Sequence, residues 1–211
     1  IRNCMFVSDP KTNSAHDPYS GIDYDSNYVD SAKERCFFYN NTIVGEYAVA
    51  CFVKDESSAA SGAPHATHYS HIFNNVCIAV GGAGLAFDFV TGSSQANDDP
   101  GFENNAGSDT SGGTSNGNVQ SVALADCNFV DTVAGQQDFH ITTGSDLEGA
   151  GLGTSDTLAD GTSTTLIDYD ITDDLASGSR PSTAADIGVD EIAAAAAGIP
   201  SGTHSLLGVG K

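Results

Sequence analysis

Acidic side chains gather in residues 21–30, where their types and spacing suit a calcium ion. Asp23 and Asp25 are separated by one residue, and Asn27 and Asp30 follow shortly after them. Ca²⁺ prefers oxygen ligands from carboxylates and amides. The sequence therefore predicts a Ca²⁺ site formed by Asp23, Asp25 and Asp30. Because the stretch lacks the glycine and the closing glutamate of an EF-hand loop, an ordinary turn stabilised by aspartate side chains is the alternative.

Carboxylates also carry out the hydrolysis of glycosidic bonds, which needs two of them about 5 to 10 Å apart. Asp55 and Asp88 occur later in the chain and, with the three aspartates above, form the best-placed set. Stacked strands would bring such residues side by side. Solvated turn acids are the simpler interpretation, so no residue is assigned as catalytic. Whether the chain is an enzyme stays open, and a non-enzymatic role is favoured.

The charge of the chain excludes several classes of partner. Acidic residues outnumber basic ones 28 to 7, and the formal net charge is −21. Such a surface repels nucleic acid phosphates and anionic membranes. A lyase acting on uronates needs Arg or Lys near an anionic substrate, so uronates are also poor candidates. No apolar run reaches the roughly 20 residues of a membrane span. We therefore expect neither a nucleic acid partner nor a membrane span.

Histidine and cysteine offer weaker possibilities. His65, His68 and His71 recur at three-residue spacing, but the surrounding sequence predicts a loop entering a strand, so exposed loop histidines are favoured over a transition-metal site. The five cysteines are scattered and lie among apolar residues, as Cys4 and Cys51 do. We interpret them as small buried hydrophobic residues. No cofactor is predicted to be required, and Ca²⁺ is the one candidate ion.

The elements that must position these side chains are strands. Apolar residues alternate or run for four to six positions around residues 42–44, 47–53 and 84–90, which is strand periodicity. Residues 57–64 and 92–117 are rich in Gly, Ser, Asn and Asp and predict loops. Residues 35–44 and 71–80 share an aromatic-Asn-Asn pattern offset by 34 residues, and residues 1–7 resemble the first half of this unit, with Cys4 aligned to Cys36. Repeated units of this length indicate stacked architectures.

The repeat resembles that of the pectate-lyase-like, right-handed parallel β-helix superfamily, whose inward asparagines stack as a ladder at a bend. One asparagine of each pair would fill this role, Asn40 or Asn41 in the first unit and Asn74 or Asn75 in the second. The ladder is favoured over N-glycosylation at the Asn-Asn-Thr sequence that begins at Asn40.

The last third of the chain carries the most specific part of this resemblance. Residues 125–131, 138–151 and 180–191 are similar to the closing segment of that superfamily, although Cys127, Asp146 and Glu148 depart from its pattern. The resemblance implies an all-β fold, a right-handed parallel β-helix (solenoid) with long loops and a short C-terminal helix or tail. Residues 1–191 would form the β-helix with its closing segment. Residues 192–211 would form a short alanine-rich helix and an extended tail suited to docking on a neighbouring subunit.

The resemblance leaves function broad, because one fold can serve many functions. The first hypothesis is a non-enzymatic extracellular protein that is structural or binds a receptor or a glycan. A phage or virion surface component (fibre, spike or decoration protein) is its favoured example. Its partners would be copies of itself or other subunits of the assembly, and a glycan is a further candidate. The expected location is extracellular or on a virion surface, and a processed or longer precursor is expected. The alternatives are a glycoside hydrolase using a carboxylate pair and a fragment of a bacterial cell-surface adhesin.

Overall fold

The architecture is taken from a computed structural model. It describes residues 2, 4–8, 20–25, 37–45, 50–55, 71–80, 85–90, 102–108, 117–133, 136–158 and 179–192. Within strands β2, β5 and β8 it describes most residues by their backbone alone. All of the regular structure in these residues is β-structure, so the all-β prediction is confirmed for this part of the chain.

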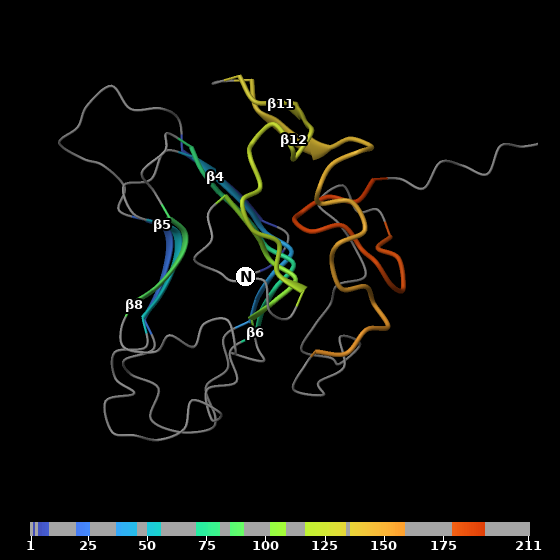
Figure 1. Ribbon diagram of the computed structural model, residues 1–211, viewed down its shortest axis with the longest axis horizontal. Coiled ribbons are helices and arrows are strands. Elements are labelled where there is room, and N and C mark those ends of the chain that lie inside the picture. The colour runs from blue at the N-terminus through green and yellow to red at the C-terminus, as the bar shows by residue number, and fades with distance from the viewer. Residues whose placement is uncertain are drawn as a thin grey trace, which may run out of the picture.

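Three parallel sheets contain ten of the twelve described strands (Figure 1). The first contains β1 (Met5–Ser8), β4 (Thr42–Gly45), β7 (Val76–Ala79) and β10 (Ala106–Gly107). The second contains β2 (Ser20–Asp25), β5 (Ala50–Asp55) and β8 (Leu85–Val90). The third contains β3 (Phe37–Tyr39), β6 (His71–Phe73) and β9 (Phe102–Glu103).

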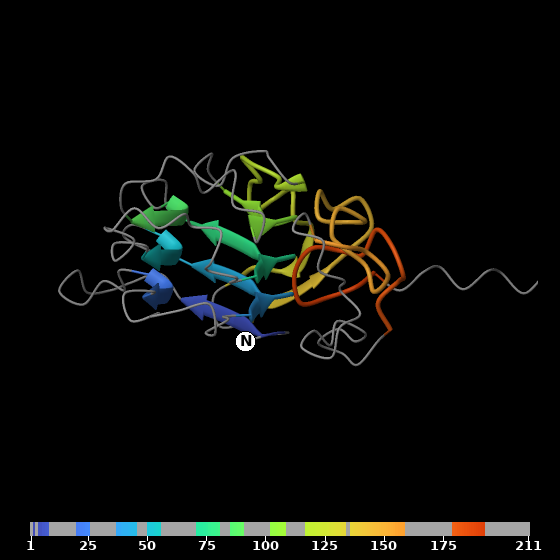
Figure 2. The ribbon, with the colours of Figure 1, turned by 90° about the horizontal axis from the view of Figure 1, so that it is seen from below.

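The chain visits these sheets in a fixed order. β3, β4 and β5 each belong to a different sheet, and β6, β7 and β8 pair beside them in the same order. Figure 2 shows strands of successive repeats lying one above another, from blue to green. The register places Thr42 beside Val76, which confirms the 34-residue offset, but it places Met5 beside Thr42. The alignment of Cys4 with Cys36 is therefore wrong, because Cys4 precedes Met5 and so corresponds to Asn41.

Side chains at equivalent positions stack inside the repeats. Phe38, Ile72 and Phe102 follow one another across β3, β6 and β9, and each is at most 2% exposed. Phe87 joins this cluster from β8 and packs edge-on against Phe102, with ring centroids 5.1 Å apart. Burying one such aromatic side chain contributes about 1.5 to 3 kcal/mol. Repetition of apolar residues at one register position thus stabilises the stack.

The central strands of the first sheet, β4 and β7, are buried on both faces, which explains their largely apolar character. One face contributes Ile43 to the interior, and the other contributes Val44 and Ile78 to a second cluster with Phe139 and Ile187. Phe139 comes from an antiparallel hairpin formed by β11 (Phe129–Asp131) and β12 (Asp138–Ile141), whose register shifts between its two paired positions. Residues 144–158 and 179–192, here called the closing segment, add Leu147 to this cluster besides Ile187, and Val122 and Cys127 join it from the segment before the hairpin.

The connecting segment at residues 92–117 and the C-terminal segment differ in how far the structure describes them. Residues 92–117 were expected to form a loop, but β9 and β10 lie within them. The reason is that residues 102–107 repeat the Asn-Asn pair of the earlier units, although Glu103 replaces the aromatic residue that precedes it there. Of the predicted C-terminal helix and tail (residues 192–211), all but Ile192 lie outside the described residues. In the part of the chain that is described, no helix has the length and apolar character to cross a bilayer.

Candidate functional site

A ladder of asparagine side chains runs through the interior beside the first sheet. Asn41 Nδ2 donates to Asn75 Oδ1 at 2.9 Å, and Asn75 Nδ2 donates to Asn105 Oδ1 at 2.9 Å. Asn105 Nδ2 donates in turn to Asn118 Oδ1 at 3.3 Å. Each Oδ1 also accepts the main-chain N–H of the preceding repeat, and at the far end Asn41 Oδ1 accepts from Cys4 N at 3.0 Å. The ladder prediction is confirmed, with Asn41 and Asn75 as its members.

Asn105 and Asn118 are two further ladder members that the sequence pattern did not predict. Residues 102–105 contain Phe-Glu-Asn-Asn, so the Asn pair was present, but Glu103 replaces the aromatic residue before it and the ladder spacing falls from 34 to 30 residues. Asn118 follows Asn105 by only 13 residues. A search at one fixed period therefore loses the last two members.

The asparagines that precede the ladder form a second set, here called the left-handed column. Asn40, Asn74 and Asn104 have φ values of 53°, 54° and 48°, and Gly117 continues the column at 75°. Asparagine and glycine tolerate this conformation better than other residues. Asn74 Oδ1 accepts from Leu152 N, and Asn74 Nδ2 donates to Leu152 O, both at 2.8 Å. The column therefore binds the main chain of the closing segment.

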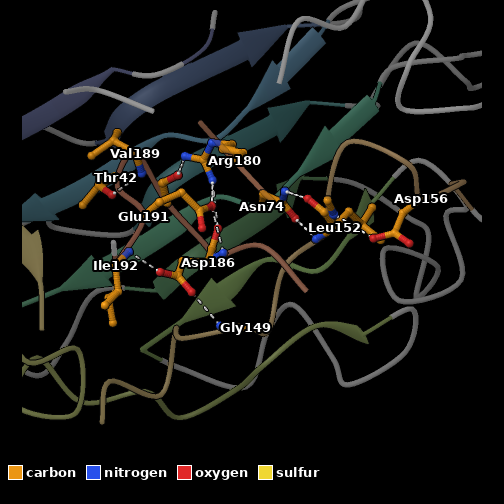
Figure 3. Close-up of polar contacts among 12 residues, drawn as sticks. Thr42, Asn74, Gly149, Leu152, Asp156, Arg180, Asp186, Val189, Glu191 and Ile192 are labelled. Atoms are coloured by element: carbon orange, nitrogen blue, oxygen red, sulfur yellow. Dashed lines mark hydrogen bonds and ion pairs between the residues drawn. The ribbon is translucent and has the colours of Figure 1, made fainter. Parts of the chain in front are cut away.

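A buried ion pair lies within the closing segment (Figure 3). Arg180 Nη1 donates to Glu191 Oε1 at 2.6 Å, and Figure 3 shows the two side chains meeting beside Thr42. The side chains of Arg180 and Glu191 are 0% and 7% exposed. Arg180 also donates to the carbonyl oxygens of Asp186 and Gly188, at 3.1 and 2.6 Å. A buried cation needs such partners, since desolvation is costly.

The other buried acids of this segment hold main-chain N–H groups. Asp186 Oδ1 accepts from Gly149 N and Oδ2 accepts from Ile192 N, each at 2.6 Å. Asp190 Oδ2 accepts from Ile141 N at 3.0 Å and so connects the segment to β12. These carboxylates stabilise the fold, because charged acceptors make strong hydrogen bonds to main-chain donors.

The closing segment also contacts the first sheet directly. Val189 N donates to Thr42 Oγ1 at 3.2 Å, and Gly188 N donates to Asn74 O at 2.9 Å. Gly188 has a φ of +108°, and a Cβ there would lie 2.8 Å from Thr42 Oγ1 and 3.0 Å from Val76 Cγ2. Glycine is required at this contact by both conformation and space.

An aspartate and a histidine form a pair on the solvent side of β12. Asp138 and His140 are two residues apart on the strand, and His140 Nδ1 lies 2.5 Å from Asp138 Oδ1. Both side chains are about half exposed. The hydrogen bond from the His140 side chain, followed by that from its main-chain N–H, lowers the pKa of Asp138. The pair orients an imidazole at the surface.

The predicted Ca²⁺ ligands are only partly described. The backbone places Asp23 and Asp25 on strand β2, so they do not belong to a turn, and Asp30 lies outside the described residues. Asp25 is registered with Asp55, and Asp23 and Asp88 are both registered with Val53. These four positions alternate along their strands and so belong to one face of the second sheet. The Ca²⁺ site remains a prediction.

Histidine and cysteine are placed as follows. His71 lies in β6, is 2% exposed and packs against the Phe37 ring, so it is a buried strand residue and was wrongly predicted as an exposed loop histidine. His65 and His68 lie outside the described residues. Burial, with the nearby charges of Asp126 and Asp146, raises the pKa of the Cys127 thiol to about 12. Such a thiol is a poor nucleophile.

Among the described residues, no three His, Cys, Asp or Glu side chains are grouped so that they could hold a metal ion. Comparison with known proteins adds no family: no protein-family model, no curated protein and no solved structure matches this chain. The polar network of the ladder, the left-handed column and the closing segment is therefore the best-defined candidate site, and its observed chemistry is the binding of main-chain groups.

Proposed function

We propose that the three parallel sheets are the faces of a right-handed parallel β-helix whose long loops lie outside the described residues. The fixed order in which the chain visits the sheets supports this proposal, since a connection between parallel strands of one sheet is right-handed in nearly all proteins. The in-register ladder from Asn41 to Asn118 supports it further, because it requires each repeat to stack directly on the next.

On this basis we propose that the chain is a non-enzymatic, extracellular protein that is structural or binds a receptor or a glycan. A phage or virion surface component is the favoured example. One observation carries the proposal. β1 and β2 are the terminal strands of their sheets at the same end of the stack. Edge strands offer unpaired main-chain groups and favour pairing with other chains, so this end of a solenoid is suited to contact with another subunit.

The use of the buried acids agrees with a structural role. Asp186, Asp190 and Glu191 accept hydrogen bonds that hold the closing segment in place. The net charge of −21 suits an exterior where counterions screen self-repulsion. An extracellular or virion-surface location and partners of the same assembly follow as part of the proposal.

The test is the mass of the purified chain by light scattering, with and without EDTA. A defined assembly in both conditions would support the structural proposal. Loss of the assembly in EDTA, reproduced by Asp23→Asn and Asp25→Asn, would place Ca²⁺ at the contact between subunits. A monomer that is indifferent to EDTA at all concentrations would overturn the assembly proposal.

The second candidate is hydrolysis of a neutral glycan. It is favoured by the register of Asp25 with Asp55, since paired strand positions lie about 5 Å apart and retaining glycosidases hold their carboxyl groups at a similar separation. A screen of neutral glycans would compare the parent chain with Asp25→Asn and Asp55→Asn. Asp131→Asn, which changes an acid on the hairpin, is the control. Hydrolysis that both strand variants lose and the control keeps would establish the enzyme.

The third candidate, a fragment of a bacterial cell-surface adhesin, shares the extracellular location and the binding role. It differs in the partner, which would be a host glycan or protein. Binding of the monomer to a glycan array, without self-assembly, would favour it over the virion component.

A further inference from the structure

Strand β1 ends the first sheet, and one of its edges pairs with no other described strand. It pairs in parallel with β4 alone, and Figure 2 shows it, in dark blue, at the end of the stack. Thr42 N donates to Cys4 O at 3.0 Å. Because the main-chain groups of successive strand residues point to opposite sides, those of Phe6 face β4, and those of Met5 and Val7 lie on the outer edge.

Apolar side chains that are buried in the next repeat are partly exposed on β1. Val7 is 43% exposed, whereas its register partner Val44 is 4% exposed. Phe6 is half-buried, whereas its register partner Ile43 is fully buried. β1 also contains no charged residue, although the chain has a formal net charge of −21. Proteins commonly protect edge strands with charged side chains, so this uncharged edge is suited to pairing with another strand.

The opposite end of the first sheet is already covered by the chain itself. Ala106 of β10 is bridged to Val119. Gly107 N donates to Val119 O, and Val122 N donates to Gly107 O, both at 3.0 Å. A second copy therefore cannot extend this sheet by placing its β1 on β10. Two copies that extend the sheet must meet through the same edge, β1 against β1, which is a symmetric contact about a two-fold axis.

The ladder distinguishes such a copy from a further parallel repeat. Within the stack, Asn41 Oδ1 accepts from Cys4 N, and Asn75 Oδ1 accepts from Asn41 N. Cys4 holds the ladder position in the repeat of β1, and its Sγ donates to Arg2 O at 3.1 Å. A thiol is a weak acceptor, so a parallel repeat stacked on β1 would find no amide oxygen there. An antiparallel partner strand needs only the main-chain groups of β1.

The distribution of charge favours the same arrangement. Arg2 is bridged to Tyr39 of β3, so it precedes β1 on the side of the third sheet. β2 follows β1 in the second sheet and carries Asp23 and Asp25. A two-fold axis that passes through β1, perpendicular to the stack, exchanges the positions of these two sheets. The Arg2 side of one copy then lies over β2 of the other, and opposite charges across a contact favour association.

We propose that β1 is the contact through which two copies of this chain pair head to head, with their β1 strands antiparallel. This inference rests on the proposed function, for which it names the partner and the interface. The contact joins two stacks into one longer stack and pairs the edge groups of Met5 and Val7.

The test is the mass of the full chain by light scattering, for the parent and for two variants at one position. Val7→Pro removes an N–H group from the outer edge, and proline is tolerated in edge strands. Val7→Thr keeps this group and is the matched control. We expect a dimer for the parent and for Val7→Thr. We expect a monomer with an unchanged circular dichroism spectrum for Val7→Pro.

Hydrogen exchange of the parent decides the matter if Val7→Pro does not fold. The amides of Met5 and Val7 should exchange slowly at high concentration and at least about tenfold faster in the dilute monomer. The amide of Phe6, which faces β4, should change less. Exchange of Met5 and Val7 that does not respond to dilution would overturn the proposal.

The masses separate failure of this contact from failure of the proposed function. An assembly of another size, or one that Val7→Pro leaves intact, would overturn the head-to-head contact and leave the structural function standing. A parent chain that is monomeric at all concentrations would overturn both.

Discussion

The stacked sheets and the closing segment are held by different kinds of interaction. In the sheets, each strand pairs in parallel with its equivalent in the next repeat, and the ladder repeats one contact from Asn41 to Asn118. In the closing segment, single side chains make several unlike contacts, and Arg180 alone serves three acceptors. A repeated contact is shared among several residues, whereas a unique one has no substitute. The closing segment should therefore be more sensitive to single substitutions.

The largest effect is expected at Arg180. Arg180→Met leaves Glu191 buried without its cation and two carbonyl groups without their donor, and should lower the free energy of unfolding by about 3 to 5 kcal/mol. Urea denaturation followed by circular dichroism measures this loss. Adding Glu191→Gln should recover part of it, because the unpaired charge is removed.

Hydrogen exchange of Arg180→Met sharpens the comparison. Amides of Gly149, Gly151 and Ile187, which donate within the closing segment, should exchange faster than those of Val76 and Val80 in and after β7. Equal acceleration of both groups would mean that the two regions unfold as one unit, and the distinction drawn above would fail.

The next effect is expected in the middle of the ladder. Asn75→Ala removes the acceptor of the Asn41 main-chain N–H and one acceptor of Asn41 Nδ2, and should lower the free energy of unfolding by about 2 to 3 kcal/mol. Asn41→Ala is the matched control near the end of the ladder, where Cys4 N loses its acceptor. Denaturation of both variants should show the larger loss for Asn75→Ala. Equal losses would show that the ladder members act independently of their place.

A smaller effect is expected where the closing segment contacts the sheet. Gly188→Ala places a Cβ at a residue with a left-handed φ and close to Thr42 Oγ1. It should lower the free energy of unfolding by about 1 to 3 kcal/mol. Gly149→Ala has a φ of +65° but finds its nearest atom, Ala184 O, at 3.7 Å. Its cost should therefore be limited to conformational strain. Thermal denaturation of the pair separates the two causes, and a Gly149→Ala variant as unstable as Gly188→Ala would contradict the steric argument.

The smallest effect is a pH dependence at the surface pair. The pKa of Asp138 is lowered in the folded protein, so its contribution to stability is present above the ordinary pKa of an aspartate, near 3.8, and is lost as the pH falls through the lowered value. Asp138→Asn should remove this contribution. The stability difference between the parent and the variant should shrink on acidification below that pKa, and a constant difference would refute the role of the pair.

Much of the stacked region could be predicted from the sequence. Short apolar runs with two-residue periodicity predicted β4, β5 and β8, and the Asn-Asn pairs predicted the ladder. Both signals can be read from the sequence because strand alternation and repetition are local properties. The same logic failed where the repeat became shorter, at Asn105 and Asn118, and where the register of residues 1–7 had to be chosen. Register depends on the pairing with another strand, and local sequence does not contain it.

The sequence by itself determined the all-β character, the ladder and the acidic charge, since each follows from residue type and spacing. Only the tertiary structure decided which asparagine of each pair turns inward, that Asn74 receives Leu152 from 78 residues away, and that Arg180 pairs with Glu191 beside Thr42. Leu152 is remote in the chain from Asn74, and Thr42 is remote from the segment that holds Arg180 and Glu191. These contacts exist because a buried polar group must find a partner wherever the fold brings one within reach.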